Sequence, residues 1–237
     1  MTAKLLQLAH AAHGGDKRIT CVVDAVEMLG VEAIRSLVLM PGIFEQAAEC
    51  EMPEGFGLSR LWEHALKVAE YAKRIVECDT EDPALIDEAY TAGLLHDIGF
   101  LIVSTRLPEI FSTVLELRKN DSYSLTKAER EAFGATHADM GGFLLDLWGI
   151  PDHIVEAISF HLHPASTPEK VYGHLMSHED EDEESISTLT AIHVANYLCE
   201  EDDPMIPDQA KAEIDNEHLE AIGMMERMEE WWEVCNK

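Results

Sequence analysis

A histidine and an aspartate stand next to each other at His96 and Asp97, inside the apolar segment GLLHDIG at residues 93–99. A carboxylate is almost never buried among apolar side chains unless it is paired or bound to a metal ion. An imidazole together with a carboxylate suits iron, manganese, zinc or nickel rather than calcium. The segment therefore predicts a divalent-metal site. The alternative is that Asp97 is paired with a histidine and holds no metal, because a buried ion pair persists without one.

The twelve histidines of the 237-residue chain offer further ligands for such a site. Some lie in apolar, helix-like stretches and are candidates for a buried site. The others lie in polar or terminal stretches and are interpreted as surface or structural residues. The candidates are His64, His96, His137, His161, His163 and His193; the others are His10, His13, His153, His174, His178 and His218.

The elements that must position these residues are predicted to be α-helices. Apolar residues recur at intervals of three and four, and no long alternating segment is present, so the fold class is all-α. Asp82 followed by Pro83 predicts a helix start, and this helix is expected to continue through the His-Asp pair to about residue 99. Other helices are expected at residues 19–29, 31–49, 62–76, 135–148, 151–163 and 186–199, and beyond residue 205.

Local signals divide the chain in two. Pro53, Gly55 and Gly57 mark a linker, so residues 1–57 are expected to form a helical N-terminal lobe. Residues 58–237 are expected to form the helical domain that carries the candidate ligands and ends in acidic helices. Within this domain Thr126 and Glu129 have the spacing of a capping box, which predicts another helix start.

The composition excludes several classes of protein. The chain has 17 Lys and Arg against 46 Asp and Glu, and its formal net charge is −29. This charge repels phosphate backbones and anionic lipids, so we expect neither a nucleic-acid partner nor a membrane partner. No apolar run approaches the roughly 18 residues of a membrane span, and the first residues lack a signal-peptide pattern. Five scattered cysteines predict reduced thiols. We therefore expect a cytoplasmic protein.

Five segments resemble, in this order, the HD superfamily of metal-dependent phosphohydrolases. They are LWEHALKVA around His64, GLLHDIG, FGATHADMGGFLL around His137, LWGIPDHIVEAISFHLHP around His161, and AIHVANYL. The Trp-Gly-Ile-Pro turn at residues 148–151 and the stretch AVEMLGVEAIRSLVL at residues 25–39 resemble the HDOD branch, the HD-related output domain of bacterial signalling proteins. The resemblance implies an HD-like helical bundle whose N-terminal lobe is cut short, so an upstream segment is expected.

The resemblance also implies a set of metal ligands. His64, His96 and Asp97 match the first three ligands of the family. Asn196 stands where the family has its fourth ligand, an aspartate. An amide oxygen coordinates a cation but brings no charge. A divalent ion (Fe, Mn, Zn or Ni) is therefore expected at low occupancy.

A second part of the family site is altered more strongly. His137, His161 and His163 fall where relatives hold a second metal or bind a phosphate. Leu162 interrupts the usual adjacent histidine pair. Phe100 stands where the related cyclic-di-GMP phosphodiesterases carry a lysine. The resemblance therefore implies the fold more strongly than the chemistry.

Two functions are consistent with this resemblance, and the changes in the ligand set favour the first. The first is a bacterial signal-transduction output module that acts through protein partners, with a receiver or sensory domain upstream. The second is a metal-dependent phosphohydrolase, in which the ion activates a water molecule. Asp97 would then orient the water, while His137 and His161 would stabilise charge on the phosphate oxygens. A domain that only dimerises is a third possibility, and the oligomeric state is left open.

Overall fold

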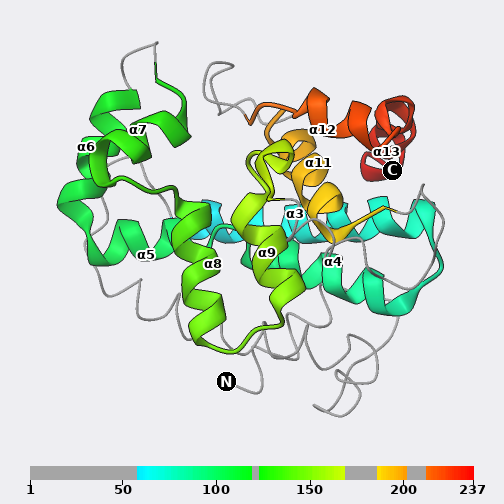
Figure 1. Cartoon of the computed structure of the whole chain (residues 1–237), viewed down its shortest axis with the longest axis horizontal. Helices are drawn as coiled ribbons and strands as arrows, with labels where there is room; N and C mark the ends of the chain where they lie inside the picture. Colours follow the sequence, from blue (N-terminus) through cyan, green and yellow to red (C-terminus); the bar gives the residue numbers. More distant parts are fainter. Residues whose placement is uncertain (1–57, 119–122, 169–185, 202–211) are drawn as a thin grey trace.

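The computed structural model describes residues 58–118, 123–168, 186–201 and 212–237 (Figure 1). The expected N-terminal lobe of residues 1–57, with its two helices, lies outside these ranges, as do His10, His13, His174 and His178. The described residues contain no strand, and the prediction of an all-α fold is confirmed. The helices are α3 (Leu58–Asp79), α4 (Pro83–Leu95), α5 (Ile98–Arg106), α6 (Pro108–Arg118), α7 (Leu125–Phe133), α8 (His137–Leu147), α9 (Asp152–Phe160), α11 (Thr188–Glu201), α12 (Asn216–Ala221) and α13 (Met228–Cys235), with 3-10 turns η1 (Pro164–Ser166) and η3 (Met225–Arg227).

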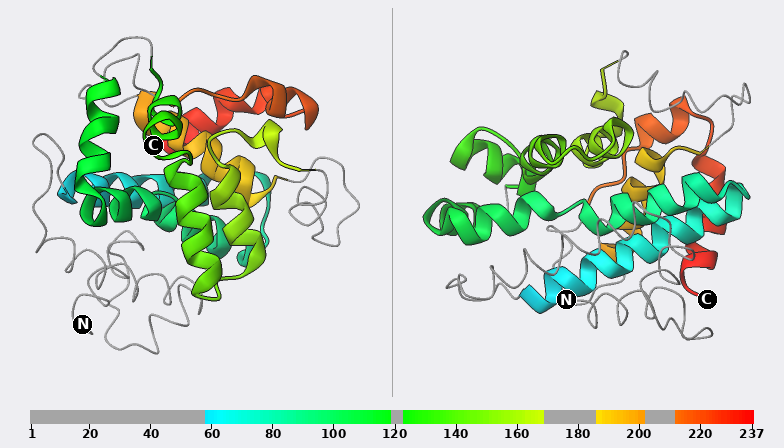
Figure 2. Two further views of the ribbon diagram at one scale, coloured as in Figure 1. Left: turned by 60° about the vertical axis from the view of Figure 1, so that its left-hand side comes forward. Right: turned by 90° about the horizontal axis from the view of Figure 1, so that it is seen from below.

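The long helix α3 is the centre of the arrangement. Helix α4 lies alongside α3, α11 crosses α3, and α13 packs against α3 as well (Figure 2). The antiparallel pair α8 and α9 covers α5, α4 and α11, while α6 and α7 form a separate layer beyond α5. The side chains that face this interior, such as Val68, Leu94 and Ile192, are almost fully buried.

Two glycines let helices approach each other closely. A Cβ atom on Gly93 would lie 2.7 Å from the Cα of Ala69, so the backbone of α4 lies directly on α3. A Cβ atom on Gly99 would overlap the carbonyl oxygen of His137 and lie 2.6 Å from the backbone nitrogen of Gly141. The absence of a side chain at Gly99 therefore brings the first turn of α8 against the start of α5.

The helix that was expected to run from Pro83 to residue 99 is broken at the His-Asp pair. Its start is confirmed, since the Asp82 side chain accepts a hydrogen bond from the Ala84 backbone at 2.9 Å. Its end is wrong, because α4 stops at Leu95, His96 and Asp97 form a turn, and α5 begins at Ile98. Aspartate competes with helical hydrogen bonding, and in a continuous helix adjacent side chains would diverge by about 100°. The turn allows both side chains to face the same space.

The capping box expected at Thr126 and Glu129 is also wrong. Helix α7 begins at Leu125, and the Ser124 hydroxyl caps it by accepting a bond from the Lys127 backbone at 3.3 Å. The chain does have a capping box one helix later. The Asp139 backbone donates to the Thr136 hydroxyl at 3.1 Å, and the Thr136 backbone donates to the Asp139 carboxylate at 2.8 Å.

The C-terminal helices are tied to α3 by polar contacts around Asp79. The Trp231 indole nitrogen donates to one carboxylate oxygen of Asp79 at 3.1 Å, and Arg227 forms an ion pair with the other. Trp231 itself is fully buried. Within the described ranges no single helix has both the length and the apolar composition of a membrane span. The segments Pro83–Arg106 and Pro108–Arg118 have that length and composition only when taken together, and a 111° bend separates them.

Candidate metal centre

Four residues that are far apart in the sequence converge on the turn between α4 and α5. His64 comes from α3 and Asn196 from α11, and the Nε2 atom of His64 lies 3.0 Å from the Oδ1 atom of Asn196. The same Nε2 atom lies 3.8 Å from an Asp97 carboxylate oxygen, and the Nε2 atom of His96 lies 3.5 Å from that oxygen. The four residues that match the family ligands along the sequence therefore lie together in space.

Asp97 also faces a second set of imidazoles. Its other carboxylate oxygen lies 3.4 Å from the Nε2 atom of His137, the first residue of α8. The ring of His161, at the end of α9, lies 5.8 Å from that of His137 and 5.2 Å from that of His96 between centroids. The two sets, one with His64 and His96 and the other with His137 and His161, share Asp97, and in each the ligand atoms lie within 4.8 Å of one another.

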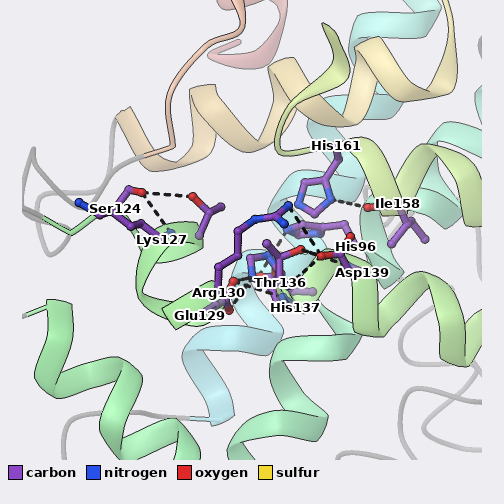
Figure 3. A network of polar contacts seen from close by, with 12 residues as sticks. His96, Ser124, Lys127, Glu129, Arg130, Thr136, His137, Asp139, Ile158 and His161 are labelled. Carbon is purple, nitrogen blue, oxygen red and sulfur yellow. Dashed lines mark hydrogen bonds and ion pairs between the residues drawn. The ribbon is translucent and has the colours of Figure 1, made fainter. Parts of the chain in front are cut away.

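Two of the imidazoles are held in one orientation by their own helices. The Nδ1 atom of His96 lies 2.7 Å from the carbonyl oxygen of Gly93, and the Nδ1 atom of His161 lies 2.7 Å from that of Ile158 (Figure 3). A carbonyl oxygen only accepts, so each Nδ1 carries the proton and each Nε2 exposes a lone pair.

Both of these Nε2 atoms are buried and have no hydrogen-bond partner among the described residues. Leaving a buried acceptor unpaired is costly, and each such atom in a folded protein calls for an explanation. A divalent cation between the two lone pairs and Asp97 would satisfy them. The residues therefore fit a metal ion in this place.

His137 is held by a side chain instead of by a carbonyl group. The two carboxylate oxygens of Glu129, on α7, lie 2.8 and 3.0 Å from its Nδ1 atom, and the His137 backbone nitrogen donates to Glu129 at 3.2 Å. Both residues are buried, with 1% of Glu129 and 2% of His137 exposed. Figure 3 shows the pair beside His96 and His161.

The charges of the cluster differ from those of free side chains. Burial lowers the pKa of His96 to about 4, and burial together with the neighbouring histidines lowers the pKa of His161 well below its usual value. Burial opposes ionisation of Asp97, but His96, His137 and His64 outweigh it and hold the pKa of Asp97 below its usual range. Burial also opposes protonation of His137, but Glu129 raises the pKa of His137 to about 9. Neutral His96 and His161 are thus ready to coordinate a cation.

The other predicted histidines have different places. His163 is exposed, and neither set of potential ligands includes it. His193 is buried, but its Nδ1 atom donates to the His161 carbonyl at 2.7 Å and its Nε2 atom accepts from the Asp215 backbone at 2.8 Å. Because both nitrogens are engaged, His193 supports the site and is not available as a ligand. Phe100 packs edge-on against His137, with ring centroids 5.4 Å apart.

Sequence reasoning missed Glu129 as part of the site, because its spacing from Thr126 suggested a helix cap. A signal for burial was present in the sequence of α7. Glu129 lies four residues from both Leu125 and Phe133, so it belongs to the apolar stripe of that helix. A glutamate in such a stripe indicates a buried partner.

The chain belongs to the HDOD domain family, whose model matches residues 1–164. This match covers the ligands from His64 to His161 and ends before Asn196. An uncharacterised protein from Treponema pallidum is 25% identical over 173 residues, which are 72% of this chain and 32% of that protein. The chain thus spans about a third of the length of this curated relative.

Three solved structures share the fold. An HDOD domain protein of unknown function from Geobacter sulfurreducens has a TM-score of 0.65 at 21% identity, covering 100% of this chain and 81% of that one. A candidate phosphohydrolase from Shewanella amazonensis has a TM-score of 0.63 at 24% identity, covering 99% and 81%. A candidate signal transduction protein from Marinobacter aquaeolei has a TM-score of 0.69 at 20% identity, covering 99% and 49%. At sequence identities of 20–24%, the similarity to these three structures establishes the fold of this chain.

Proposed function

We propose that this chain is a regulatory output module of bacterial signalling that acts through protein partners and keeps a weakened divalent-metal site in its core. Membership of the HDOD family supports the signalling part. One relative in fold carries the name of a candidate signal transduction protein. The metal would contribute to holding α3, α8, α9 and α11 around the turn at Asp97.

The observation that carries the metal site is the pair of unpartnered Nε2 atoms on His96 and His161, two residues whose ligand atoms lie close to Asp97. His64, His96, Asp97 and Asn196 would form the first ligand set, and His137 and His161 would extend it. A bound divalent cation would supply Lewis acidity and local positive charge. His96 and His161 would need no deprotonation to bind it, because their Nε2 lone pairs are already free.

Three features support regulation over hydrolysis. Asn196 contributes no negative charge. Its amide oxygen lies 3.0 Å from the Nε2 atom of His64, and this hydrogen bond has to break before His64 coordinates a cation. Phe100 places an apolar ring against His137. His96, His137 and His161 are each at most 2% exposed, whereas a phosphoester that reacts at the site has to reach it.

A second candidate function is a metal-dependent phosphohydrolase. The observation that favours it is the location of the Asp97 carboxylate between the two sets of imidazoles, with its oxygens 3.4–3.8 Å from three Nε2 atoms. In this reading Asp97 orients the attacking water. His137, which Glu129 keeps protonated, stabilises charge on the phosphoryl oxygens together with His161.

Elemental analysis combined with a hydrolysis assay separates the two functions. The protein is purified without chelator and without metal-affinity resin, its metal content per chain is measured, and it is then loaded with Mn²⁺ or Zn²⁺ and given a generic phosphodiester. We expect less than one metal ion per chain and no turnover above buffer. Full metal occupancy with ready turnover would establish the hydrolase instead.

A further inference from the structure

We propose that Glu129 is a positioning residue that holds His137 with its Nε2 atom directed into the metal site. The inference rests on the proposed metal site. Glu129 directs both carboxylate oxygens at Nδ1 of His137, at 2.8 and 3.0 Å, and the opposite ring nitrogen lies 3.4 Å from Asp97. The contacts thus form a chain from carboxylate to imidazole to the site, which is the arrangement that orients metal-binding histidines in proteins.

The need for a carboxylate follows from the place of each histidine in its helix. His96 and His161 follow the last turns of α4 and α9, where free carbonyl groups are available, and each uses the carbonyl three residues before it. His137 is the first residue of α8, and the first turn of a helix exposes N–H groups instead of carbonyls. An acceptor for its Nδ1 proton has to come from another element, and α7 supplies it.

The same helix start stabilises the buried carboxylate. The backbone nitrogen of His137 donates to Glu129 at 3.2 Å, and the positive end of the α8 dipole faces it. Only 1% of Glu129 is exposed, although it lies on a helix with exposed positions on either side at Lys127 and Glu131. Both oxygens of this buried carboxylate contact one imidazole. We therefore infer that Glu129 orients His137 and is not needed merely to pack α7.

Glu129 also compensates in part for the negative charge that is missing at Asn196. Asp97 is the single carboxylate in the two sets of potential ligands found among the described residues. Glu129 places a second negative charge one imidazole away, where it strengthens His137 as a ligand once the incoming cation has displaced the Nε2 proton of His137. Removal of such an outer carboxylate weakens metal affinity about 10–100-fold in known sites.

The test titrates Co²⁺ into the metal-free full chain and follows visible absorption, which reports the ligands of the ion. We expect Glu129→Gln to weaken Co²⁺ binding about 10-fold or more. The matched control Glu131→Gln removes the same charge from an exposed position of α7 and is expected to bind as the wild type does. Wild-type affinity in Glu129→Gln would overturn the proposal.

A double-mutant cycle tests whether Glu129 acts through His137. His137→Gln is expected to weaken Co²⁺ binding, and adding Glu129→Gln to it is expected to cause no further loss. Full additivity of the two losses would assign Glu129 a general structural role and overturn the proposal.

Nitrogen NMR of the metal-free wild type provides a measurement that depends neither on the folding of the variants nor on metal binding. We expect Nδ1 of His137 to be protonated, with a slowly exchanging hydrogen. A rapidly exchanging or unprotonated Nδ1 would overturn the role of Glu129. A wild type that shows the protected Nδ1 but binds no Co²⁺ would instead refute the metal part of the proposed function and leave the positioning of His137 by Glu129 established.

Discussion

The carbonyl oxygen of His161 accepts a hydrogen bond from the Nδ1 atom of His193, with 2.7 Å between the two atoms. The other nitrogen of His193 accepts from the backbone of Asp215 at 2.8 Å, and the Asp215 carboxylate accepts from the backbone of Ala165 at 2.9 Å. One buried imidazole therefore connects the end of α9, where His161 enters the candidate site, with the segment that leads into α12.

This connection predicts a dependence of stability on acid. Burial lowers the pKa of His193 to about 4, from 6.5 in the unfolded chain. The unfolded state therefore binds the proton first as pH falls, so the contribution of His193 is complete above pH 6.5 and is lost between pH 6.5 and 4. The loss is on the order of 3 kcal/mol. Buried His96 and His161, whose pKa values are also lowered, lose stability in the same direction, so urea unfolding of the metal-free wild type at several pH values measures the sum. The difference between the wild type and a His193 variant measures the share of His193.

The variant His193→Gln is expected to flatten this part of the pH profile by up to one proton. The same replacement at exposed His163 is the control. The charge of His163 is only a minor contributor to the low pKa of His193, so the profile of this variant is expected to stay close to that of the wild type. An equally steep loss of unfolding free energy in His193→Gln would show that the acid sensitivity comes from other groups.

Removing the Asp97 carboxylate is expected to destabilise the metal-free protein. In Asp97→Ala the imidazole of His137 loses the opposite charge 3.4 Å away, and breaking a buried charge pair typically costs about 3–5 kcal/mol. Asp97 keeps 18% of its side chain exposed, which places the expected loss at the lower end, about 3 kcal/mol. The urea midpoint measures it, with exposed Asp146→Ala as the control. An unchanged midpoint in Asp97→Ala would contradict the buried pairing.

Restoring charge at Asn196 is expected to raise metal content. Asn196→Asp adds a negative charge beside His64, where little water screens it. Turnover is not expected to follow, because Leu162 and Phe100 remain unchanged. Metal per chain and phosphodiester hydrolysis are measured for the wild type, Asn196→Asp, and Asn196→Asp with Leu162→His.

The exposed Asn216, at the start of α12, gives the matched control Asn216→Asp. This variant adds the same charge on the surface and is expected to keep the metal content of the wild type. Equal metal content in Asn196→Asp and the wild type would contradict a ligand role for residue 196.

The close crossing of α5 and α8 makes Gly99 sensitive to any side chain. Gly99→Ala would place a methyl group onto the carbonyl oxygen of His137, so we expect α8 to shift and stability to fall by about 1–3 kcal/mol. Gly141→Ala on the facing helix adds a Cβ atom 3.2 Å from the Gly99 nitrogen, a milder contact, and is expected to cost less. Thermal unfolding ranks the two variants. A larger loss in Gly141→Ala would contradict the described crossing.

Local patterns in the sequence were sufficient for the helices and for the family. The three-and-four spacing of apolar residues predicted an all-α fold, and Asp82 with Pro83 predicted the start of α4 correctly, because helix periodicity and capping depend on residues within a few positions of one another. The order of His64, His96-Asp97, His137 and His161 indicated the HD superfamily. The Trp-Gly-Ile-Pro turn at residues 148–151 and the stretch at residues 25–39 indicated its HDOD branch.

The tertiary structure decided how these residues meet. The tertiary structure has a turn at His96 and Asp97, between α4 and α5, so both side chains of the pair face one side. It engaged both nitrogens of His193, left His163 at the surface and placed Glu129 behind His137. The contact between His64 and Asn196 joins residues 132 positions apart. Such contacts depend on which helix faces meet, and the period of an amphipathic helix predicts that a face is buried without specifying what it is buried against.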